Sequence, residues 1–298
     1  MSRKGSLAVS FVILAVFAYF LYEYDVIPRL AQMVRRLHPV YLFLSLLVYC
    51  SVYFFRAKRF ALLFPQIKTL DLSAVIAVHT FFNNVMPFRS GEASFPIILK
   101  KLFGVDASVS STALTVARLL DLFSLALLFL VSALFVAAGR WELMVIPAVA
   151  LVAILLFAFL AFKLVKLLKG RFAVFATVFA FLTEFVSLRK VFYMLGLSVA
   201  IWVFKFLSFY FILRAAGVNL NYFQTVFAST FAELTTVLPV HSVGGFGTFE
   251  AGLVGGFALL GFKGSYALTV AFYFHLLLLL MSGLLAFGGW LYLSRRLR

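Results

Sequence analysis

The chain has 298 residues, of which 65% are hydrophobic and only 12% are charged. This balance excludes a soluble globular domain and predicts an all-α polytopic membrane protein. The formal net charge of +16 could indicate a protein that binds nucleic acid. However, the Lys and Arg residues cluster between apolar segments, where membrane topology and anionic lipid headgroups account for them. We therefore expect no nucleic-acid partner.

Six apolar segments are long enough, or nearly long enough, to cross a bilayer, which takes about 17–25 helical residues. The first two are short and would rely on flanking aromatic residues to reach the interfaces. The third and the sixth are long, so they should tilt or protrude. In chain order the predicted spans cover residues 7–22, 40–55, 108–138, 143–162, 191–213 and 265–293.

The distribution of basic residues predicts the orientation. With the N-terminus inside, most Lys and Arg residues of the loops fall on the cytoplasmic side, as in most cell-membrane proteins. Both termini should then be cytoplasmic. A seventh span at residues 172–188 would move the basic C-terminal tail outside. Because this stretch contains Glu184 and has basic residues at both ends, we expect an interfacial helix there, with residues 29–38 as its counterpart on the outer side.

Two breaks interrupt the hydrophobic sequence, at residues 86–93 and 238–251. Each separates two apolar segments that are too short to cross a bilayer. Irregular backbone is costly in lipid unless it is buried in protein or lines a wet cavity, and breaks at corresponding places of two halves point to a transporter binding site. The residues expected to break the helices are Pro87, Gly91, Pro239 and Gly247.

Each break is expected to form the tip of a re-entrant helical hairpin. Residues 72–86 and 93–102 would enter from the cytoplasm, and residues 222–238 and 249–261 from outside. With this assignment, the basic residues that flank the first hairpin lie on the cytoplasmic side.

The order span, span, hairpin, span then occurs twice in one transmembrane domain, 1–298. The first repeat would cover residues 1–140 and the second 141–298. Three crossings per repeat invert the orientation, so the two tips should meet near the membrane midplane. Ser90-Gly91-Glu92-Ala93 matches Thr248-Phe249-Glu250-Ala251. In each, we expect the hydroxyl residue to cap the returning half-helix and the Glu to occupy its first turn.

Arg89 is the leading candidate for binding an anion, because it lies at the tip of the first break. A guanidinium can bind a phosphate through two parallel hydrogen bonds, and a returning half-helix that begins at Gly91 would direct free N–H groups toward the same place. The alternative is that Arg89 pairs with Glu92 or Glu250. Intramembrane charges are usually functional and usually paired.

Other charged residues at membrane depth have two interpretations. Arg118 and Asp121 are three residues apart, so they form either a local ion pair or a cavity-facing Arg oriented by the acid. Glu92 and Glu250 could carry protons, or could only balance a helix dipole and an Arg. Glu233 is expected to line the cavity. Lys205 should snorkel or pair with an acid such as Glu233.

The remaining candidates are uncharged or weakly charged. Asn83 and Asn84 should satisfy backbone groups at the first tip, with substrate contact as a secondary role. His241 could titrate but is more often simply solvated. Gly244 and Gly245 permit positive φ and could form an anion-binding nest. The complete set of predicted substrate-binding residues is Arg89, Arg118, Asn83, Asn84, Ser90, Glu92, Asp121, Glu233, His241, Gly244, Gly245, Thr248 and Glu250.

Several motifs, in their order and spacing, carry a resemblance over nearly the whole chain. They are Arg56-Ala57-Lys58-Arg59-Phe60, Asn83-Asn84-Val85-Met86-Pro87-Phe88-Arg89-Ser90-Gly91-Glu92, Arg118-Leu119-Leu120-Asp121, and Leu238-Pro239 followed by Gly244-Gly245-Phe246-Gly247-Thr248-Phe249-Glu250. The chain resembles the flippase-like membrane family named for the transmembrane region of lysylphosphatidylglycerol synthase. This resemblance implies re-entrant helices and the movement of phospholipid or polyprenyl-phosphate-linked headgroups. The chain ends at Arg298 without the aminoacyl-transferring or glycosyltransferase domain fused in some relatives, so synthase activity is not expected.

We therefore expect a transporter of an anionic lipid headgroup, working by alternating access at a midplane site, with H+ or another ion as a coupling partner. No metal cluster, nucleophile elbow or P-loop is recognisable, so we expect no cofactor, no metal and no enzymatic activity. The alternatives are an ion-coupled carrier of a small soluble anion, a lipid-phosphate transferase and a scaffold subunit. The lipid, the direction of transport and the oligomeric state stay open.

Overall fold

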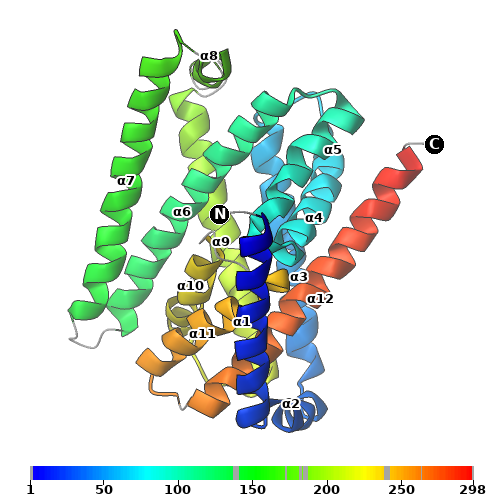
Figure 1. Cartoon of the computed structure of the whole chain (residues 1–298), viewed down its shortest axis with the longest axis vertical. Coiled ribbons are helices and arrows are strands. Elements are labelled where there is room, and N and C mark those ends of the chain that lie inside the picture. Colours follow the sequence, from blue (N-terminus) through cyan, green and yellow to red (C-terminus); the bar gives the residue numbers. More distant parts are fainter. Residues whose placement is uncertain are drawn as a thin grey trace. The chain divides into compact units, whose positions relative to one another are not determined.

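The computed structural model describes residues 3–136, 141–171, 173–180, 183, 187–237, 242–262 and 264–296. Within these ranges the chain is helical and contains no strand (Figure 1). The prediction of an all-α protein is confirmed.

Long helices stand at all six predicted spans. Among the described residues, five helices are long and apolar enough to cross a membrane. The sixth predicted span corresponds to α1 (Arg3–Glu23), which meets the same test only when joined to α2 (Val26–Arg35), from which it bends by 70°. The five helices are α3 (Pro39–Ala61), α6 (Ala107–Val136), α7 (Glu142–Leu168), α9 (Leu188–Ala215) and α12 (Gly264–Arg296).

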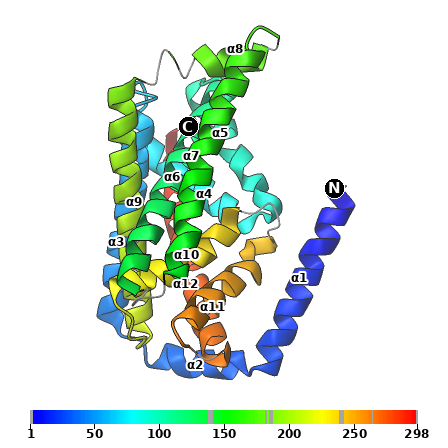
Figure 2. The same cartoon turned by 90° about the vertical axis from the view of Figure 1, so that its left-hand side faces the viewer.

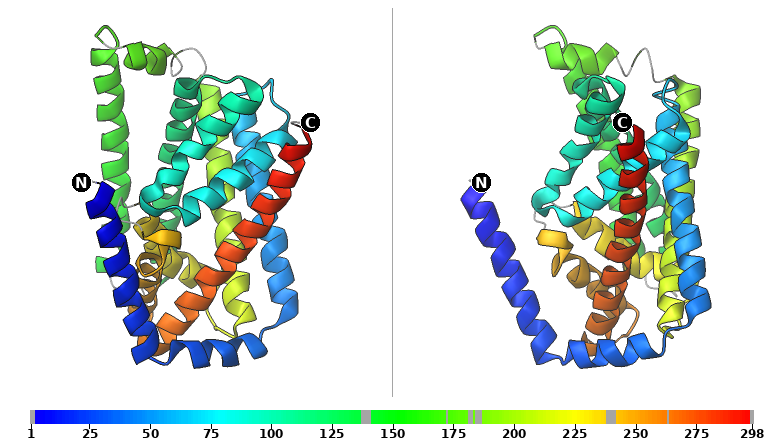
Figure 3. Two further views of the ribbon diagram at one scale, coloured as in Figure 1. Left: turned by 45° about the vertical axis from the view of Figure 1, so that its right-hand side comes forward. Right: turned by 90° about the vertical axis from the view of Figure 1, so that its right-hand side faces the viewer.

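Two short helices occupy the stretches for which we predicted interfacial helices. The sharp turn from α1 into α2 is visible in Figure 2, and α2 is packed through Val26, which is fully buried with Phe17 and Phe272. The other short helix, α8 (Ala173–Ala180), has eight residues, about 12 Å at 1.5 Å per residue. It lies across one end of α7 (Figure 3). Parts of the predicted stretch 172–188 lie outside the described residues.

The chain divides into two compact units, and each unit combines segments from both halves of the sequence. The first contains Met1–Cys50, His79–Glu92 and Lys205–Phe287, and the second contains Ser51–Val78, Ala93–Phe204 and Gly288–Arg298. This division differs from the repeat boundary that we placed at residue 140, and the inverted repeat stays a prediction.

Both breaks are flanked by helices shorter than a span. The first lies between α4 (Thr69–Val85) and α5 (Ser94–Phe103), with a 3₁₀ segment, η1 (Pro87–Ala93), in between. The second lies between α10 (Tyr222–Val237) and α11 (Thr248–Leu259) and includes η3 (Val243–Gly245).

Glycines let α10 and α11 pack closely within the first unit. A Cβ atom on Gly252 would come within 2.7 Å of the carbonyl oxygen of Phe231, and one on Gly256 within 2.4 Å of that of Ala228. These two glycines are four residues apart and therefore share one helix face. The sequence thus folds this stretch into two half-helices whose backbones touch, which brings the second break to the end of a packed pair.

Candidate functional site

The first break folds back tightly onto the helix before it. A Cβ atom added to Gly91 would come within 2.4 Å of the backbone carbon and oxygen of Phe82. No ordinary side chain fits there, because real Cβ atoms do not approach backbone so closely. Gly91 is therefore required by close contact, which brings η1 against the last turn of α4.

Arg89 has a strained backbone at this break. Its φ is 55°, in the left-handed region that only Asp25 shares among the described non-glycine residues. For an L-residue this conformation costs roughly 1–2 kcal/mol, and such strain is concentrated at functional sites. The strain thus marks Arg89 as a residue whose position is imposed by the surrounding fold.

The side chain of Arg89 forms an ion pair with Glu92. Its Nη2 donates to Glu92 Oε1 at 2.8 Å, and the two side chains are 21% and 29% exposed. His79, which is buried in α4, places its Nε2 3.8 Å from Glu92 Oε2. Of the partners that we considered for Arg89, the structure shows Glu92.

The two hydroxyl residues do not cap the returning helices, and this prediction is wrong. Ser90 Oγ donates to the carbonyl oxygen of Pro87 at 2.9 Å, and Thr248 Oγ1 donates to that of Gly245 at 3.0 Å. Both hydroxyls therefore bond backward into their own loops instead of accepting from helix N–H groups.

The two breaks also differ in where the second helix starts. The helix α5 begins at Ser94 instead of near Gly91, so Glu92 precedes it in η1, and the expected first-turn position is wrong. Glu250 does lie in the first turn of α11, as predicted. Gly247, not Thr248, is the residue before that helix.

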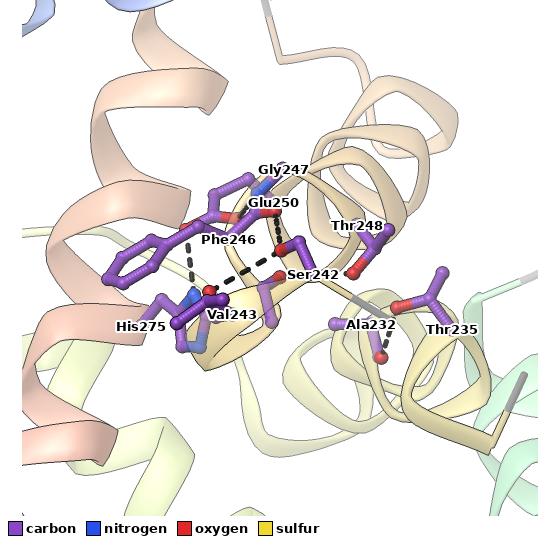
Figure 4. A network of polar contacts seen from close by, with 10 residues as sticks. Ala232, Thr235, Ser242, Val243, Phe246, Gly247, Thr248, Glu250 and His275 are labelled. Carbon is purple, nitrogen blue, oxygen red and sulfur yellow. Dashed lines mark hydrogen bonds and ion pairs between the residues drawn. The ribbon is translucent and has the colours of Figure 1, made fainter. Parts of the chain in front are cut away.

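The second break consists of glycines in left-handed conformations. Gly244, Gly245 and Gly247 have φ values of 67°, 73° and 86°, as their sequence positions predicted. Ser242 Oγ donates to the carbonyl oxygen of Phe246 at 2.5 Å and so closes the loop (Figure 4). Pro239 and His241, which we had also placed in this break, lie outside the described residues.

Glu250 connects this loop to α12. Its Oε2 accepts the backbone N–H of Gly247 at 2.7 Å, and its Oε1 lies 2.7 Å from His275 Nδ1 (Figure 4). Both side chains are almost completely enclosed, at 0% exposed for Glu250 and 7% for His275. The imidazole also packs on the ring of Phe249, with a centroid distance of 4.4 Å. We had not predicted this pair.

Both breaks are attached to the same face of α12. Asn84 Nδ2 lies 3.5 Å from Ser282 Oγ, and Ser282 is seven residues, or two turns, beyond His275. Two turns correspond to about 10 Å along the helix. The neighbouring Asn83 has a buried Oδ1 with no hydrogen-bond partner among the described residues. Both Asn side chains thus belong to the first unit together with the two tips, Pro87–Glu92 and Ser242–Glu250.

Glu233 pairs with Lys205, as predicted for the lysine. Lys205 Nζ lies 2.7 Å from Glu233 Oε1, and the two side chains are 13% and 7% exposed. The lysine also lies over the ring of Phe209, at 5.4 Å from its centroid. Glu233 is therefore neutralised within the first unit by a cation on α9.

Asp121 belongs to an arginine cluster within the second unit. Arg59 binds it bidentately, with Nη1 donating to Oδ1 at 2.5 Å and Nη2 donating to Oδ2 at 3.1 Å. Arg59 Nη1 also donates to Ser198 Oγ at 2.6 Å. Arg118 and Arg56 act electrostatically on the same carboxylate. The spacing of Arg118 and Asp121 did not indicate the long-range partner Arg59.

Three functional candidates were missing from the sequence-based set: His79, His275 and Arg59. Each is an ionisable residue within an apolar helix, and such residues are expected to be functional by default. That signal could have identified them, although it could not have assigned their partners. Among the described residues, no group of three or more His, Cys, Asp or Glu side chains is arranged to hold a metal ion.

Comparison with known proteins identifies the family. No curated protein matches the chain. The family model described as "Lysylphosphatidylglycerol synthase TM region" matches residues 6–286. This range includes both breaks, the Arg59–Asp121 pair and the Glu250–His275 pair. Because the match extends over nearly the whole chain, this protein belongs to the family of the lysylphosphatidylglycerol synthase transmembrane region.

Proposed function

We propose that this protein moves the headgroup of an anionic phospholipid or of a polyprenyl-phosphate-linked lipid from one leaflet to the other. Family membership indicates a membrane function related to lipids. The apolar helices support the same general role, because a lipid substrate can keep its tails in the bilayer while only its headgroup follows a polar path.

One observation carries the proposal: the partly exposed Arg89 guanidinium, fixed at a break between two short helices. Its side chain is 21% exposed, and the ion pair with Glu92 occupies Nη2. A guanidinium has five N–H donors in a planar fork, so a second edge can bind two phosphate oxygens. The strained φ of 55° places this group where an unstrained helix could not.

The proposed mechanism is alternating access at the two tips. In it, α4 with α5 and α10 with α11 are re-entrant hairpins that enter from opposite sides of the membrane, related by an inverted repeat. This arrangement is supported by the placement of both tips in one unit and by their attachment to one face of α12. The Gly-rich second tip would move, while Arg89 neutralises the phosphate.

The test is a headgroup-accessibility assay in liposomes that contain the purified protein and a labelled anionic phospholipid. Arg89→Ala should abolish headgroup movement, and Arg89→Lys should restore little, because a point charge cannot reproduce the planar fork. Arg29, an exposed arginine on α2 of the same unit, provides the matched control, and Arg29→Ala should keep the wild-type rate.

A double variant separates substrate binding from simple charge balance. If Arg89 only neutralises Glu92, then Arg89→Ala combined with Glu92→Gln should recover transport, since the unpaired partner is the main penalty. Recovery would refute the binding role of Arg89. Unimpaired transport by Arg89→Ala alone would refute it as well. Transport of a soluble anion without headgroup movement would instead establish the alternative carrier.

A further inference from the structure

Two ion pairs of the first unit have both side chains at most 13% exposed, and they differ in chemistry. Lys205 and Glu233 form one, and a lysine stays charged across the physiological pH range. Glu250 and His275 form the other. Histidine is the side chain whose ordinary charge change falls between about pH 5 and pH 8. Of these two pairs, only the second contains a histidine.

We propose that H+ is the coupling ion of transport and that it binds at the Glu250–His275 pair, where it releases the second tip. The proton site is argued from geometry. Its role in coupling rests on the proposed headgroup transport. The site takes a proton as its ligand, and the Oε atoms of Glu250 and the ring nitrogens of His275 are its acceptors.

The contact between His275 Nδ1 and Glu250 Oε1 accommodates one proton. At 2.7 Å the two atoms share a single hydrogen. When Nε2 of His275 also carries a hydrogen, the shared hydrogen can lie on Nδ1, giving an imidazolium and a carboxylate, or on oxygen, giving a neutral imidazole and a carboxylic acid. Both forms have zero net charge, which suits a pair with side chains that are only 7% and 0% exposed.

A second proton weakens one of the contacts of Glu250. Its Oε1 is occupied by His275, and its Oε2 accepts the N–H of Gly247 at 2.7 Å. When the imidazole and the carboxyl group are both protonated, the added O–H hydrogen must lie on one of these two oxygens. That oxygen keeps only a weak acceptor lone pair for the donor that faces it, so the contact is weakened. Protonation is thereby linked to the attachment of the tip.

The glycines of the second tip allow it to move when a contact of Glu250 weakens. Gly244, Gly245 and Gly247 all have left-handed φ values, and glycine has more backbone freedom than any other residue. Besides the bond from Gly247 to Glu250, the loop has a bond from the N–H of Val243 to Ser10 Oγ at 3.2 Å. Releasing Gly247 therefore removes one of the loop's anchors to the rest of the first unit.

Among the described neighbours of the Glu250–His275 pair, the other charged side chains are engaged with partners of their own. On α10, Glu233 is neutralised by Lys205 of α9. On α12, the hydroxyl of Tyr273 donates to the carbonyl oxygen of Ile212 at 3.3 Å. The part of α1 that approaches the loop, from Ser10 to Phe17, contains no ionisable residue. At the first tip of the same unit, Glu92 is engaged by Arg89 and His79.

Two aromatic rings of the second tip pack against His275. Phe249 stacks on the imidazole with an interplanar angle of 27°, and Phe246 lies at a centroid distance of 4.9 Å. These contacts hold the imidazole against the second tip.

The experiment measures the mobility of the tip as a function of pH. The only cysteine, Cys50, is replaced by Ala, and a spin label is attached through Val243→Cys, whose native side chain is 43% exposed. In liposomes, we lower the pH from about 8 to about 5, the range in which histidine ordinarily titrates. The electron paramagnetic resonance lines of the label should then narrow, because the tip becomes more mobile. In the variant Glu250→Gln with His275→Gln, two amides can bond to each other and to Gly247, so the narrowing should be lost.

A matched control uses the other ion pair. Lys205→Gln with Glu233→Gln makes the same exchange at a pair without a histidine, so the pH response should persist. If the first double variant does not fold, His275→Gln alone should shift the response to higher pH, because the neutral amide no longer favours the charged carboxylate of Glu250. A wild-type spectrum that is independent of pH refutes the proposed proton site. An unchanged pH response in the Glu250→Gln, His275→Gln variant refutes it as well.

Headgroup movement, measured on the same liposomes, separates this inference from the proposed function. A pH gradient should accelerate headgroup movement in the wild type and should have no effect in the Glu250→Gln, His275→Gln variant. A responsive tip with no headgroup movement leaves the proton site intact and refutes the proposed function. Headgroup movement that is insensitive to the gradient overturns H+ as the coupling ion and leaves the proposed function intact.

Discussion

The two breaks contain the same acidic residue in different surroundings. Glu92 is 29% exposed, and it is shared between Arg89 and a His79 nitrogen 3.8 Å away. Glu250 is completely enclosed and makes two contacts of 2.7 Å. The first break is accessible and has a permanent cation, which suits the binding of an anion. The second is enclosed and has a titratable partner, which suits a conformational response to protons.

The two breaks should differ most in how much stability is lost when the glutamate of each is replaced by alanine. Glu250→Ala leaves His275 and the N–H of Gly247 without their acceptor inside the protein, so we expect a loss of about 3–5 kcal/mol, as for other broken buried pairs. Glu92→Ala removes a partly exposed pair and should cost at most about 1 kcal/mol. Thermal unfolding in detergent measures both. Equal losses would contradict the difference in burial.

Glycine substitutions test the two breaks through different forces. Gly91→Ala places a Cβ within 2.4 Å of the Phe82 backbone, and overpacking of this kind costs about 1–3 kcal/mol. Gly247→Ala has a nearest contact of 3.0 Å to Ile13 but forces a φ of 86°, which costs about 1–2 kcal/mol. Gly196→Ala, where nothing lies within 4 Å, is the control and should be harmless. A harmless Gly91→Ala would show that η1 does not fold back on α4.

The backbone strain at Arg89 predicts an unusual order of stability. Arg89→Gly should be more stable than Arg89→Ala by about 1 kcal/mol, because relief of the left-handed strain exceeds the entropic cost of glycine. Both variants lack the guanidinium, so both should be inactive in the headgroup assay. Denaturant unfolding of the two variants measures the difference. A less stable glycine variant would contradict the positive φ.

The smallest effect is expected where the first break meets α12. The contact between Asn84 and Ser282 is 3.5 Å long, at the limit of a hydrogen bond, and Ser282→Ala should cost only about 0.5 kcal/mol. His275→Ala, two turns earlier on the same helix, should cost several times more because Glu250 is then left as an unpaired buried charge. Comparable losses would show that α12 holds both breaks equally.

Local patterns predicted a large part of the fold. The apolar runs located the six long helices, and the Pro and Gly residues located both interruptions, because hydrophobic length and backbone restriction are properties of neighbouring residues. Of the two interpretations of Lys205, snorkelling or pairing with an acid such as Glu233, the structure shows the pairing. The helix starts were less accurate, since the hydroxyls of Ser90 and Thr248 can bond either to helix N–H groups or back into their loops.

The sequence by itself determined which residues are charged, which helices are long and where the chain breaks. Only the tertiary structure decided which charges meet. His275 is 25 residues from Glu250, and Arg59 is 62 residues from Asp121, so no local period links them. Their pairing depends on how the helices of each unit pack, and packing is set by many weak contacts that act together. The burial that encloses Glu250 and leaves Glu92 accessible arises only at that level.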